Sequence, residues 1–429
     1  MDKYIQYFRQ ARNLLRQEKA FCAIYILGTG LSITVVMALL IVFHIKIANV
    51  YPETNRDRML SVKRGMERSE TTTSSGGISH TFIETCLKPL ENAEAVTAVS
   101  AGEARVQSEG SRRSVAVKRL YTDEDFWTVF RFRFSEGKPY TAADVQSGIP
   151  VAVVARSLAQ RLFGDAGAVG QYLIMNSRQY RICGVAEDAS WIAANCYAQV
   201  WTPYSVDPDI AQGWGLSGFM GNMQAYILAS SSAGVGKTKR EIEDRFRRFA
   251  AQCTEAAPDL LGQPDIHWQS VFREGDNSID FSRVVWQYGL VVFVLLLVPA
   301  VSLSGMADSR MERRLAEMGI RRAFGAPAST LMRQVLFENF LFTLPGGMAG
   351  LLFSWILVVA SGRWIMNIGQ SLTEIPPGDA AVGFTPTMLF NLPVFGLLLL
   401  VCFLLNLFSA LIPAWRASRH QIVDSLNVN

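Results

Sequence analysis

The chain has 429 residues, of which 50% are apolar and 18% are charged. Such a low charged fraction excludes an intrinsically disordered chain and argues against a purely water-soluble one. The formal net charge of +4 is too small for the strong basic field of a nucleic-acid-binding protein. The length allows roughly three domains of about 150 residues each.

Four stretches of the sequence contain no Asp, Glu, Lys, Arg or His. They are residues 20–43, 284–307, 339–362 and 380–415. Each is longer than the roughly 20 residues with which a helix crosses about 30 Å of hydrocarbon. We predict four transmembrane helices, the first an uncleaved anchor rather than a cleaved signal peptide. Their expected bounds are residues 20–47, 283–307, 339–362 and 388–413.

The charges between these stretches predict the topology. The net charge is +3 for residues 1–19, +2 for residues 308–338 and +1 for residues 416–429, but −3 for residues 49–282. Because positive loops stay on the cytoplasmic side, both chain ends and the 308–338 loop are expected inside. We therefore expect an amphipathic cytoplasmic helix at 1–19, a large external domain at 48–282, a cytoplasmic coupling loop at 308–338, a short external loop at 363–387 and a cytoplasmic tail at 414–429.

The expected external domain has the pattern of a mixed α/β fold, so the fold class is an α-helical membrane protein with an α/β domain inserted between its first two spans. Two subdomains fit into its length. The hydrophobic patterns predict helices at 78–92, 156–163 and 237–253, strands at 95–100, 114–121, 149–154, 172–175, 180–185, 198–201, 223–229 and 266–271, and a flexible loop at 71–77.

Residues 231–238, SSAGVGKT, approximate a phosphate-binding loop between a predicted strand and a predicted helix. The first glycine of that motif is replaced by Ser231, and no acidic strand end follows to hold magnesium. We interpret the segment as an ordinary strand-to-helix loop on the external side. The four His are scattered, and runs such as Asp123–Asp125 look like solvated faces. We predict no catalytic, cofactor-binding or metal-binding residues, and we expect the external cysteines to be free thiols, although disulfides stay open there.

The 308–338 loop predicts two helices that meet at Gly325-Ala326-Pro327, where Gly325 suits a helix C-cap and Pro327 a first helical turn. The first helix is amphipathic and basic. Periodicity leaves two interpretations open: a helix on the membrane surface whose arginines meet lipid phosphates, or a lever docked on a cytoplasmic partner. In the third span, Gly346 and Gly350 form a GxxxG pattern, which serves either a helix contact or the relief of local crowding.

Several motifs in order resemble the MacB- and FtsX-like ABC transporter permeases. The run 314–326, RLAEMGIRRAFGA, is similar to the coupling signature of that family. Residues 121–144 and 151–185, the latter with LAQRLFG, VGQ and CGVAED, resemble its external core, and residues 412–426 resemble its cytoplasmic ending. The order of one span, a large external domain and three further spans is also the family's.

This resemblance implies a permease of the bacterial inner membrane without its own ATPase site. It implies a homodimer or close heterodimer, and an ATP-binding subunit on a separate cytoplasmic chain, since only 19 residues precede the first span. The matching ATPase-coupling residues are Glu317, Gly319, Arg321, Arg322, Gly325 and Ala326.

We expect ATP-driven movements of the external domain that export or extract a substrate, with a periplasmic adaptor as one further partner. The alternative is a signalling permease that controls an external partner such as a cell-wall hydrolase. The larger external core resembles exporters more than cell-division permeases, which favours export.

Overall fold

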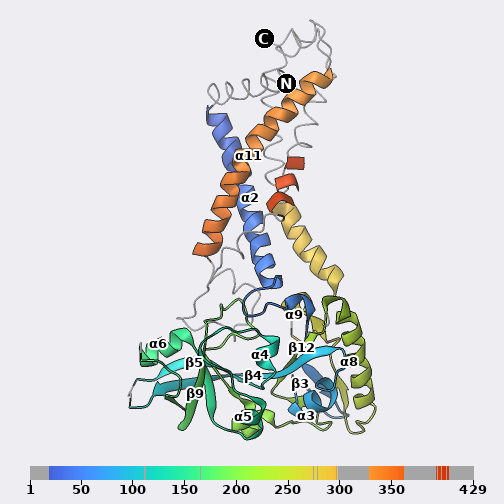
Figure 1. Ribbon diagram of the computed structural model, residues 1–429. Helices are drawn as coiled ribbons and strands as arrows, with labels where there is room; N and C mark the ends of the chain where they lie inside the picture. Colours follow the sequence, from blue (N-terminus) through green and yellow to red (C-terminus); the bar gives the residue numbers. More distant parts are fainter. Residues whose placement is uncertain are drawn as a thin grey trace. The chain divides into compact units, whose positions relative to one another are not determined.

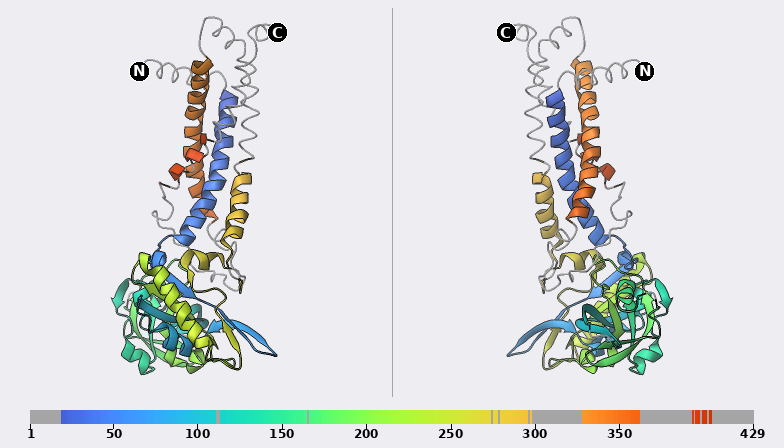
Figure 2. Two further views of the ribbon diagram at one scale, coloured as in Figure 1. Left: turned by 90° about the vertical axis from the view of Figure 1, so that its right-hand side faces the viewer. Right: turned by 90° about the vertical axis from the view of Figure 1, so that its left-hand side faces the viewer.

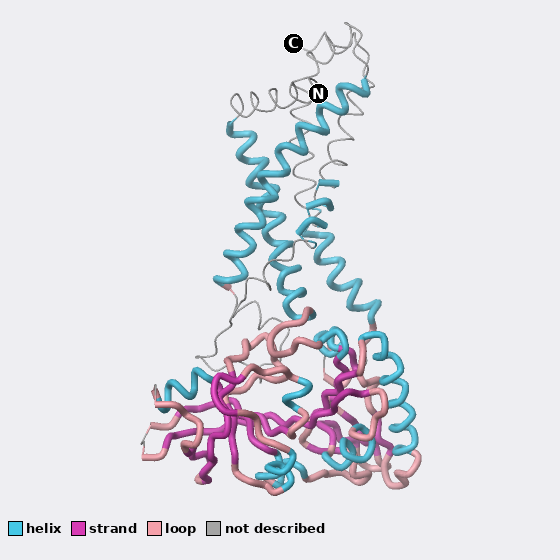
Figure 3. Tube along the Cα trace, in the orientation of Figure 1, coloured by secondary structure: helices cyan, strands magenta, loops and turns pink. Residues whose placement is uncertain are grey.

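The computed structural model describes two units of the chain. The described residues are 19–110, 113–164, 166–273, 275–277, 279–295, 297, 328–361, 393, 395–397, 399–401 and 403–404. The helical unit contains residues 1–43, 281–368 and 385–429, and the α/β unit contains residues 44–280 and 369–384. Figure 3 shows that the described strands lie in the α/β unit.

Long apolar helices form the helical unit. Helix α2 (Lys19–Ile47) has its last four residues in the α/β unit. Among the described residues, helix α11 (Ala328–Ala360) begins at the residue after Pro327, which the sequence predicts to lie in the first turn of a helix. Among the described residues, one helix is long and apolar enough to cross a membrane, at Ile26–Ile47, and two shorter apolar helices span Phe281–Leu295 and Leu344–Ala360. These three helices overlap the first three predicted spans, whereas most of the fourth lies outside the described residues.

Glycines bring α2 and α11 into close contact where the two helices cross (Figure 1). A Cβ on Gly350 would lie 2.8 Å from the carbonyl oxygen of Gly30 and from Ile33, and a Cβ on Gly346 would lie 2.2 Å from the hydroxyl of Thr29. Thr34 donates to the carbonyl of Gly350 at 3.3 Å. The GxxxG pattern therefore serves a contact between the first and third apolar helices of one chain.

Replacing Gly350 with alanine is expected to destabilise the helical unit by about 1–3 kcal/mol, because the added methyl group meets backbone that cannot move aside. Gly28 on α2 provides the control, since a Cβ there meets nothing within 4 Å. Gly28→Ala should raise stability slightly through helix propensity. Thermal unfolding of the full chain in detergent measures both, and equal effects of the two substitutions would contradict the contact.

The α/β unit is built from short helices around two sheets. Its strands are β1 (Met59–Val62), β2 (Gly65–Arg68), β3 (Thr73–Ile78), β4 (Ala93–Ser108), β5 (Val115–Thr122), β6 (Phe134–Gly137), β7 (Val151–Ala155), β8 (Tyr172–Met175), β9 (Arg178–Ala186), β10 (Val200–Pro203), β11 (Met220–Gly221), β12 (Gln224–Ala229), β13 (Ala257–Asp259) and β14 (Asp265–Ile266). Its helices are η1 (Arg56–Arg58), α3 (His80–Phe82), η2 (Ile83–Leu87), α4 (Phe126–Val129), α5 (Ala142–Gln146), α6 (Arg156–Phe163), η3 (Tyr204–Val206), α7 (Pro208–Ala211), η4 (Ser232–Gly234), α8 (Val235–Ala250) and α9 (His267–Phe272).

Six strands of the larger sheet close into a ring. The order β4-β5-β10-β7-β9 is completed by β8, which pairs with both β9 and β4. The pairs β5–β10 and β7–β9 are parallel, and α6 lies in the crossover between β7 and β9. Closure buries an apolar interior around Trp201, Phe126 and Phe130, each fully buried.

Beyond this ring the sheet continues through β12 and β1 to β14, and a second sheet has the order β11-β3-β2-β13. Helix α8 lies along the surface of the unit (Figure 2) and packs its phenylalanines Phe246 and Phe249 against Phe82 and Phe219. A second buried cluster gathers there. Two large buried clusters therefore make up most of the apolar core of the described unit, and a small third one forms around Trp191 and Tyr197.

Many predicted elements are found with small shifts in their ends, and α6 matches its predicted range. The helix predicted at 78–92 is found only over residues 80–87, as α3 and the π-helical η2. Two further predictions are wrong. The expected flexible loop at 71–77 contains strand β3, whose backbone pairs with β2 and β11. The expected strand at 266–271 is two strand residues followed by helix α9. Strand β3 pairs with the neighbouring β2 and with the distant β11, and this tertiary pairing overrides the local pattern.

Candidate functional site

The predicted coupling residues Glu317, Gly319, Arg321, Arg322, Gly325 and Ala326 lie outside the described residues. The structure therefore leaves their role a prediction.

A group of buried polar residues surrounds the C-terminal end of α2, within the α/β unit. Arg56 is 3% exposed. Its Nη1 donates to the carbonyl oxygens of Ile45 at 3.0 Å and Ala48 at 2.8 Å, and its Nη2 donates to that of Ile192 at 2.9 Å. The last carbonyls of a helix have no partner inside the helix. Here a guanidinium satisfies them.

Glu53 is the counter-ion of Arg56. Its Oε2 accepts from Arg56 Nε at 2.6 Å, and its Oε1 accepts from the backbone N–H of Asn195 at 3.1 Å. Burial raises the pKa of Glu53, but the Arg56 guanidinium and other neighbouring positive charge outweigh it and hold that pKa below its usual value. The carboxylate therefore stays charged at neutral pH.

His267, the first residue of α9, completes this group. Its Nε2 lies 2.9 Å from the carbonyl oxygen of Lys46, to which it donates. Burial, followed by the Arg56 charge, lowers the pKa of His267 to about 4. The imidazole is therefore neutral at physiological pH. We call Glu53, Arg56 and His267 the helix-end clamp.

The clamp residues flank two paired strands: Glu53 and Arg56 precede β1, and His267 directly follows β14. Strand β1 follows α2, and β14 precedes the helix at Phe281–Leu295; the two strands are neighbours, with Leu60 opposite Ile266. Just beyond β14, Arg273 pairs with both oxygens of Asp265 at 2.5 and 2.8 Å. Both connections to the apolar helices are thus fixed to one sheet edge.

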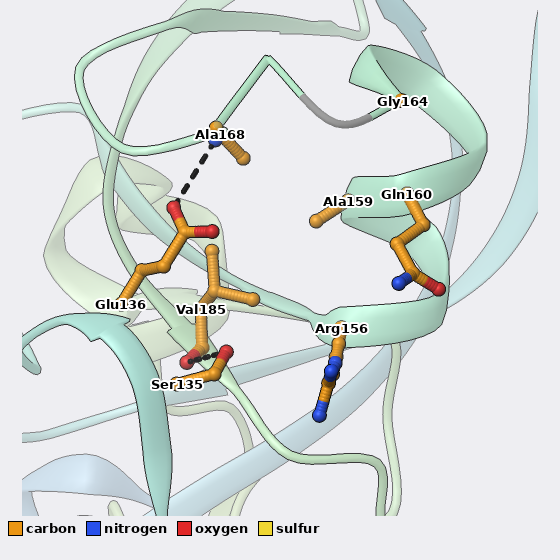
Figure 4. Close-up of a pocket in the computed structure, with 9 residues that line it drawn as sticks. Ser135, Glu136, Arg156, Ala159, Gln160, Gly164, Ala168 and Val185 are labelled. Carbon is orange, nitrogen blue, oxygen red and sulfur yellow. Dashed lines mark hydrogen bonds between the residues drawn. The ribbon is translucent and has the colours of Figure 1, made fainter.

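A polar cavity of about 310 Å³ lies beside α6 and strands β6 and β9 (Figure 4). Glu136 accepts from the N–H of Ala168 at 3.3 Å, Ser135 donates to the carbonyl of Val185, and Arg156 pairs with Glu187 at 3.1 Å. These groups all have partners within the protein. The described lining therefore offers polar groups that are already hydrogen-bonded or ion-paired within the protein.

The SSAGVGKT segment is a strand-to-helix loop. It connects β12 to α8, and Ser231 caps its first turn by accepting from the N–H of Gly234 at 3.1 Å. Thr238, the residue that would hold magnesium in a phosphate-binding loop, is fully buried and donates to the carbonyl of Asn92 at 3.1 Å. Its hydroxyl is therefore engaged in a hydrogen bond that holds α8 to the turn before β4.

Two neighbouring substitutions separate these interpretations. Thr238→Val should lower stability by about 1 kcal/mol, because it removes the hydrogen bond from α8 to the carbonyl of Asn92, which keeps its donors from Ser230. Lys237 is exposed, and Lys237→Ala should leave stability and any ATP-driven activity unchanged. Thermal unfolding and activity of the full chain with its ATP-binding partner measure both. Loss of activity with Lys237→Ala in a folded protein would revive the nucleotide interpretation.

Asp123, predicted from the sequence to lie on a solvated face, makes a buried structural contact instead. It is 2% exposed and binds Lys88 at 2.9 Å, so the solvated-face interpretation of this residue is wrong.

The cysteines Cys86, Cys183, Cys196 and Cys253 are free thiols. Burial raises the pKa of Cys183 to about 11, which keeps it protonated. The described residues contain no group of three His, Cys, Asp or Glu that could hold a metal ion.

Two family models match the chain in sequence. Residues 22–245 match the MacB-like periplasmic core domain, and residues 289–422 match the FtsX-like permease C-terminal domain. The first match covers more than half of the chain and contains most of the α/β unit. The second contains α11 and the predicted coupling residues.

Similar proteins carry export or permease names. The macrolide export ATP-binding/permease protein MacB of Salmonella paratyphi A is 25% identical over 65% of this chain and 41% of its own length. The pyoverdine export protein PvdT of Pseudomonas entomophila is 25% identical over 57% of this chain and 35% of its own. The uncharacterized ABC transporter permease YknZ of Bacillus subtilis is 21% identical over 70% of this chain and 77% of its own length. The chain thus spans about two fifths or less of the lengths of MacB and PvdT.

Among solved structures, the periplasmic region of MacB from Actinobacillus actinomycetemcomitans covers 47% of this chain and 89% of its own, with 14% identity and a TM-score of 0.35. The extracellular domain of YknZ from Gram-positive bacteria matches 46% of this chain and 98% of its own length, with 13% identity and a TM-score of 0.34. The family models, rather than these weak superpositions, decide the assignment: the chain belongs to the MacB/FtsX-like ABC transporter permeases, with a MacB-like periplasmic core of mixed α/β fold.

Proposed function

We propose that this chain is the permease subunit of an ABC transporter of the bacterial inner membrane. Four helices span the membrane, the α/β unit lies on the outer side, and the 308–338 loop lies in the cytoplasm. The observation that carries this proposal is the order of the two family domains: the match to the MacB-like periplasmic core includes the first apolar helix and precedes the FtsX-like part.

An ATP-binding subunit on a separate chain supplies the free energy. The matched segments correspond to permease parts, and they cover only 41% of MacB, whose name includes an ATP-binding function. Residues Glu317, Gly319, Arg321, Arg322, Gly325 and Ala326 contact that subunit. ATP binding displaces this loop, the spanning helices carry the displacement outward, and the α/β units of a homodimer or close heterodimer open and close.

The transported compound is exported or extracted at the outer face of the membrane. The names of two relatives, a macrolide exporter and a pyoverdine exporter, support export over signalling. A large substrate that enters from the outer side need not pass the centre of the bilayer. This agrees with predicted spans that contain no ionisable residue in residues 284–307 and 339–362.

Labelling of single cysteines in intact cells tests the topology. A cysteine that replaces Lys237 should react with a membrane-impermeant reagent from outside, and one that replaces Arg322 should react only after the membrane is opened. Reaction of Arg322→Cys from outside would refute the assignment of the coupling loop to the cytoplasm, and with it the contact to a cytoplasmic ATP-binding subunit.

A further inference from the structure

We propose that Arg56 is a positioning residue for transport. It holds the C-terminal end of α2 at a fixed orientation on the closed ring of strands, so that a displacement of this helix end moves the α/β unit. The inference rests on the proposed function, because it requires an ATP-driven displacement to transmit. Every group in the contact belongs to the α/β unit itself.

At the helix end, the Arg56 guanidinium donates hydrogen bonds to carbonyl oxygens that elsewhere usually accept from water or from the backbone N–H groups of a glycine cap. The positive charge also matches the negative end of the helix dipole. Because the guanidinium is planar and its five N–H donors point in fixed directions, the acceptors at Ile45 and Ala48 set the angle of the helix end, not only its distance.

On the domain side, the same guanidinium binds the segment between β9 and β10, two strands of the closed ring. Nη2 donates to the carbonyl of Ile192, while Glu53 joins Nε of Arg56 to the backbone N–H of Asn195. One side chain thus connects the end of α2 to the ring, in addition to the covalent chain. His267 contributes a second hold on Lys46 from the segment that leads to the next apolar helix.

Stability alone is a poor reason for such an arrangement. Burying an ion pair costs desolvation that its attraction often only offsets, and apolar replacements of similar volume are commonly as stable. What a buried guanidinium adds is a fixed geometry among several acceptors. A membrane helix that must rotate or shift a domain needs that geometry at its end.

The test compares Arg56→Lys with Arg119→Lys. Lysine keeps the charge of Arg56 but loses the planar fork. Arg119 is similarly buried, at 1% exposed, but its side-chain hydrogen bonds within the described residues go to Thr202 and Tyr180 of the ring. It therefore reports the effect of losing a buried arginine of this unit without touching the helix end.

Each full-length variant is reconstituted with its ATP-binding subunit in lipid nanodiscs. Hydrogen exchange is measured with and without a non-hydrolysable ATP analogue. In the wild type, the analogue should change exchange in residues 187–199. In Arg56→Lys this change should fall by about tenfold, since the fork is lost, while ATP-binding subunit binding and basal hydrolysis persist. Arg119→Lys should retain the change.

Two results would overturn the inference. If the nucleotide-dependent change in hydrogen exchange is undiminished in Arg56→Lys, the planar guanidinium is not needed to move the α/β unit. If the change is lost equally in both variants, general destabilisation explains the effect. A wild-type complex that binds its ATP-binding subunit but shows no nucleotide-dependent change outside the membrane would overturn the proposed function as well, which separates the two failures.

Discussion

The Glu317→Lys variant is expected to insert into the membrane normally and to lose at least about tenfold of its stimulation of the partner ATPase. If residues 314–326 form a docked lever, the reversed charge lies in a partly desolvated contact. Its free-energy cost there is far larger than that of a charge reversal at an exposed site, which is below about 1 kcal/mol. Gly325→Val should act likewise, because a β-branched residue resists the left-handed backbone of a helix C-cap.

Glu312→Lys is the matched control, because it reverses a charge in the same loop but outside the RLAEMGIRRAFGA run. It should leave stimulation near the wild-type level. The alternative of a helix on the membrane surface predicts the opposite for Glu317→Lys, since added positive charge strengthens contact with anionic lipid. Pull-down of the ATP-binding subunit and coupled ATP hydrolysis decide: full binding with full stimulation in Glu317→Lys would refute the lever.

The Asp123→Ala variant is expected to lower the free energy of unfolding of the α/β unit by about 3–5 kcal/mol, because the buried donors of Thr97, Ala98 and Phe126 lose their acceptor. The carboxylate of Asp123 accepts from the hydroxyl of Thr97 at 2.5 Å and from the N–H groups of Ala98 and Phe126 at 3.1 and 3.2 Å. It also binds Lys88 at 2.9 Å. One side chain thereby joins β4, the start of α4 and the end of η2.

Asp125 provides an internal control, since it binds the same Lys88 at 2.6 Å but its side chain is 35% exposed. Asp125→Ala should cost below about 1 kcal/mol, as is usual for pairs that water can reach. Denaturant unfolding of the full chain in detergent, followed by tryptophan fluorescence, compares the two. Similar losses for both variants would show that the buried network around Asp123 is not what holds these elements together.

The sequence predicted local elements well where the signal is local. Helix α6 has its predicted bounds, and the turn between β8 and β9 falls at Asn176 and Ser177, both with positive φ, as a tight hairpin requires. The segment after β14 misled because a short apolar pattern cannot distinguish a strand from a helix.

The sequence could not predict which polar residues are buried. Glu53 and Arg56 stand in a run of charged and turn residues that resembles an exposed loop, and their burial depends on Ile192 and Asn195, more than 130 positions away. Asp123 was misjudged for the same reason. One signal was present: an acid and an arginine three residues apart, directly after the last residues of an apolar helix, where a cation can bind free carbonyls.

The central claim is that ATP consumed by a separate subunit moves the α/β unit on the other side of the membrane. Hydrogen exchange of the wild-type complex in nanodiscs tests it most directly, with the ATP analogue present or absent. The account predicts a nucleotide-dependent change in residues 44–60 and 187–199 that requires the ATP-binding subunit. An α/β unit whose exchange is the same with and without nucleotide, in a complex that binds its ATP-binding subunit, would contradict it.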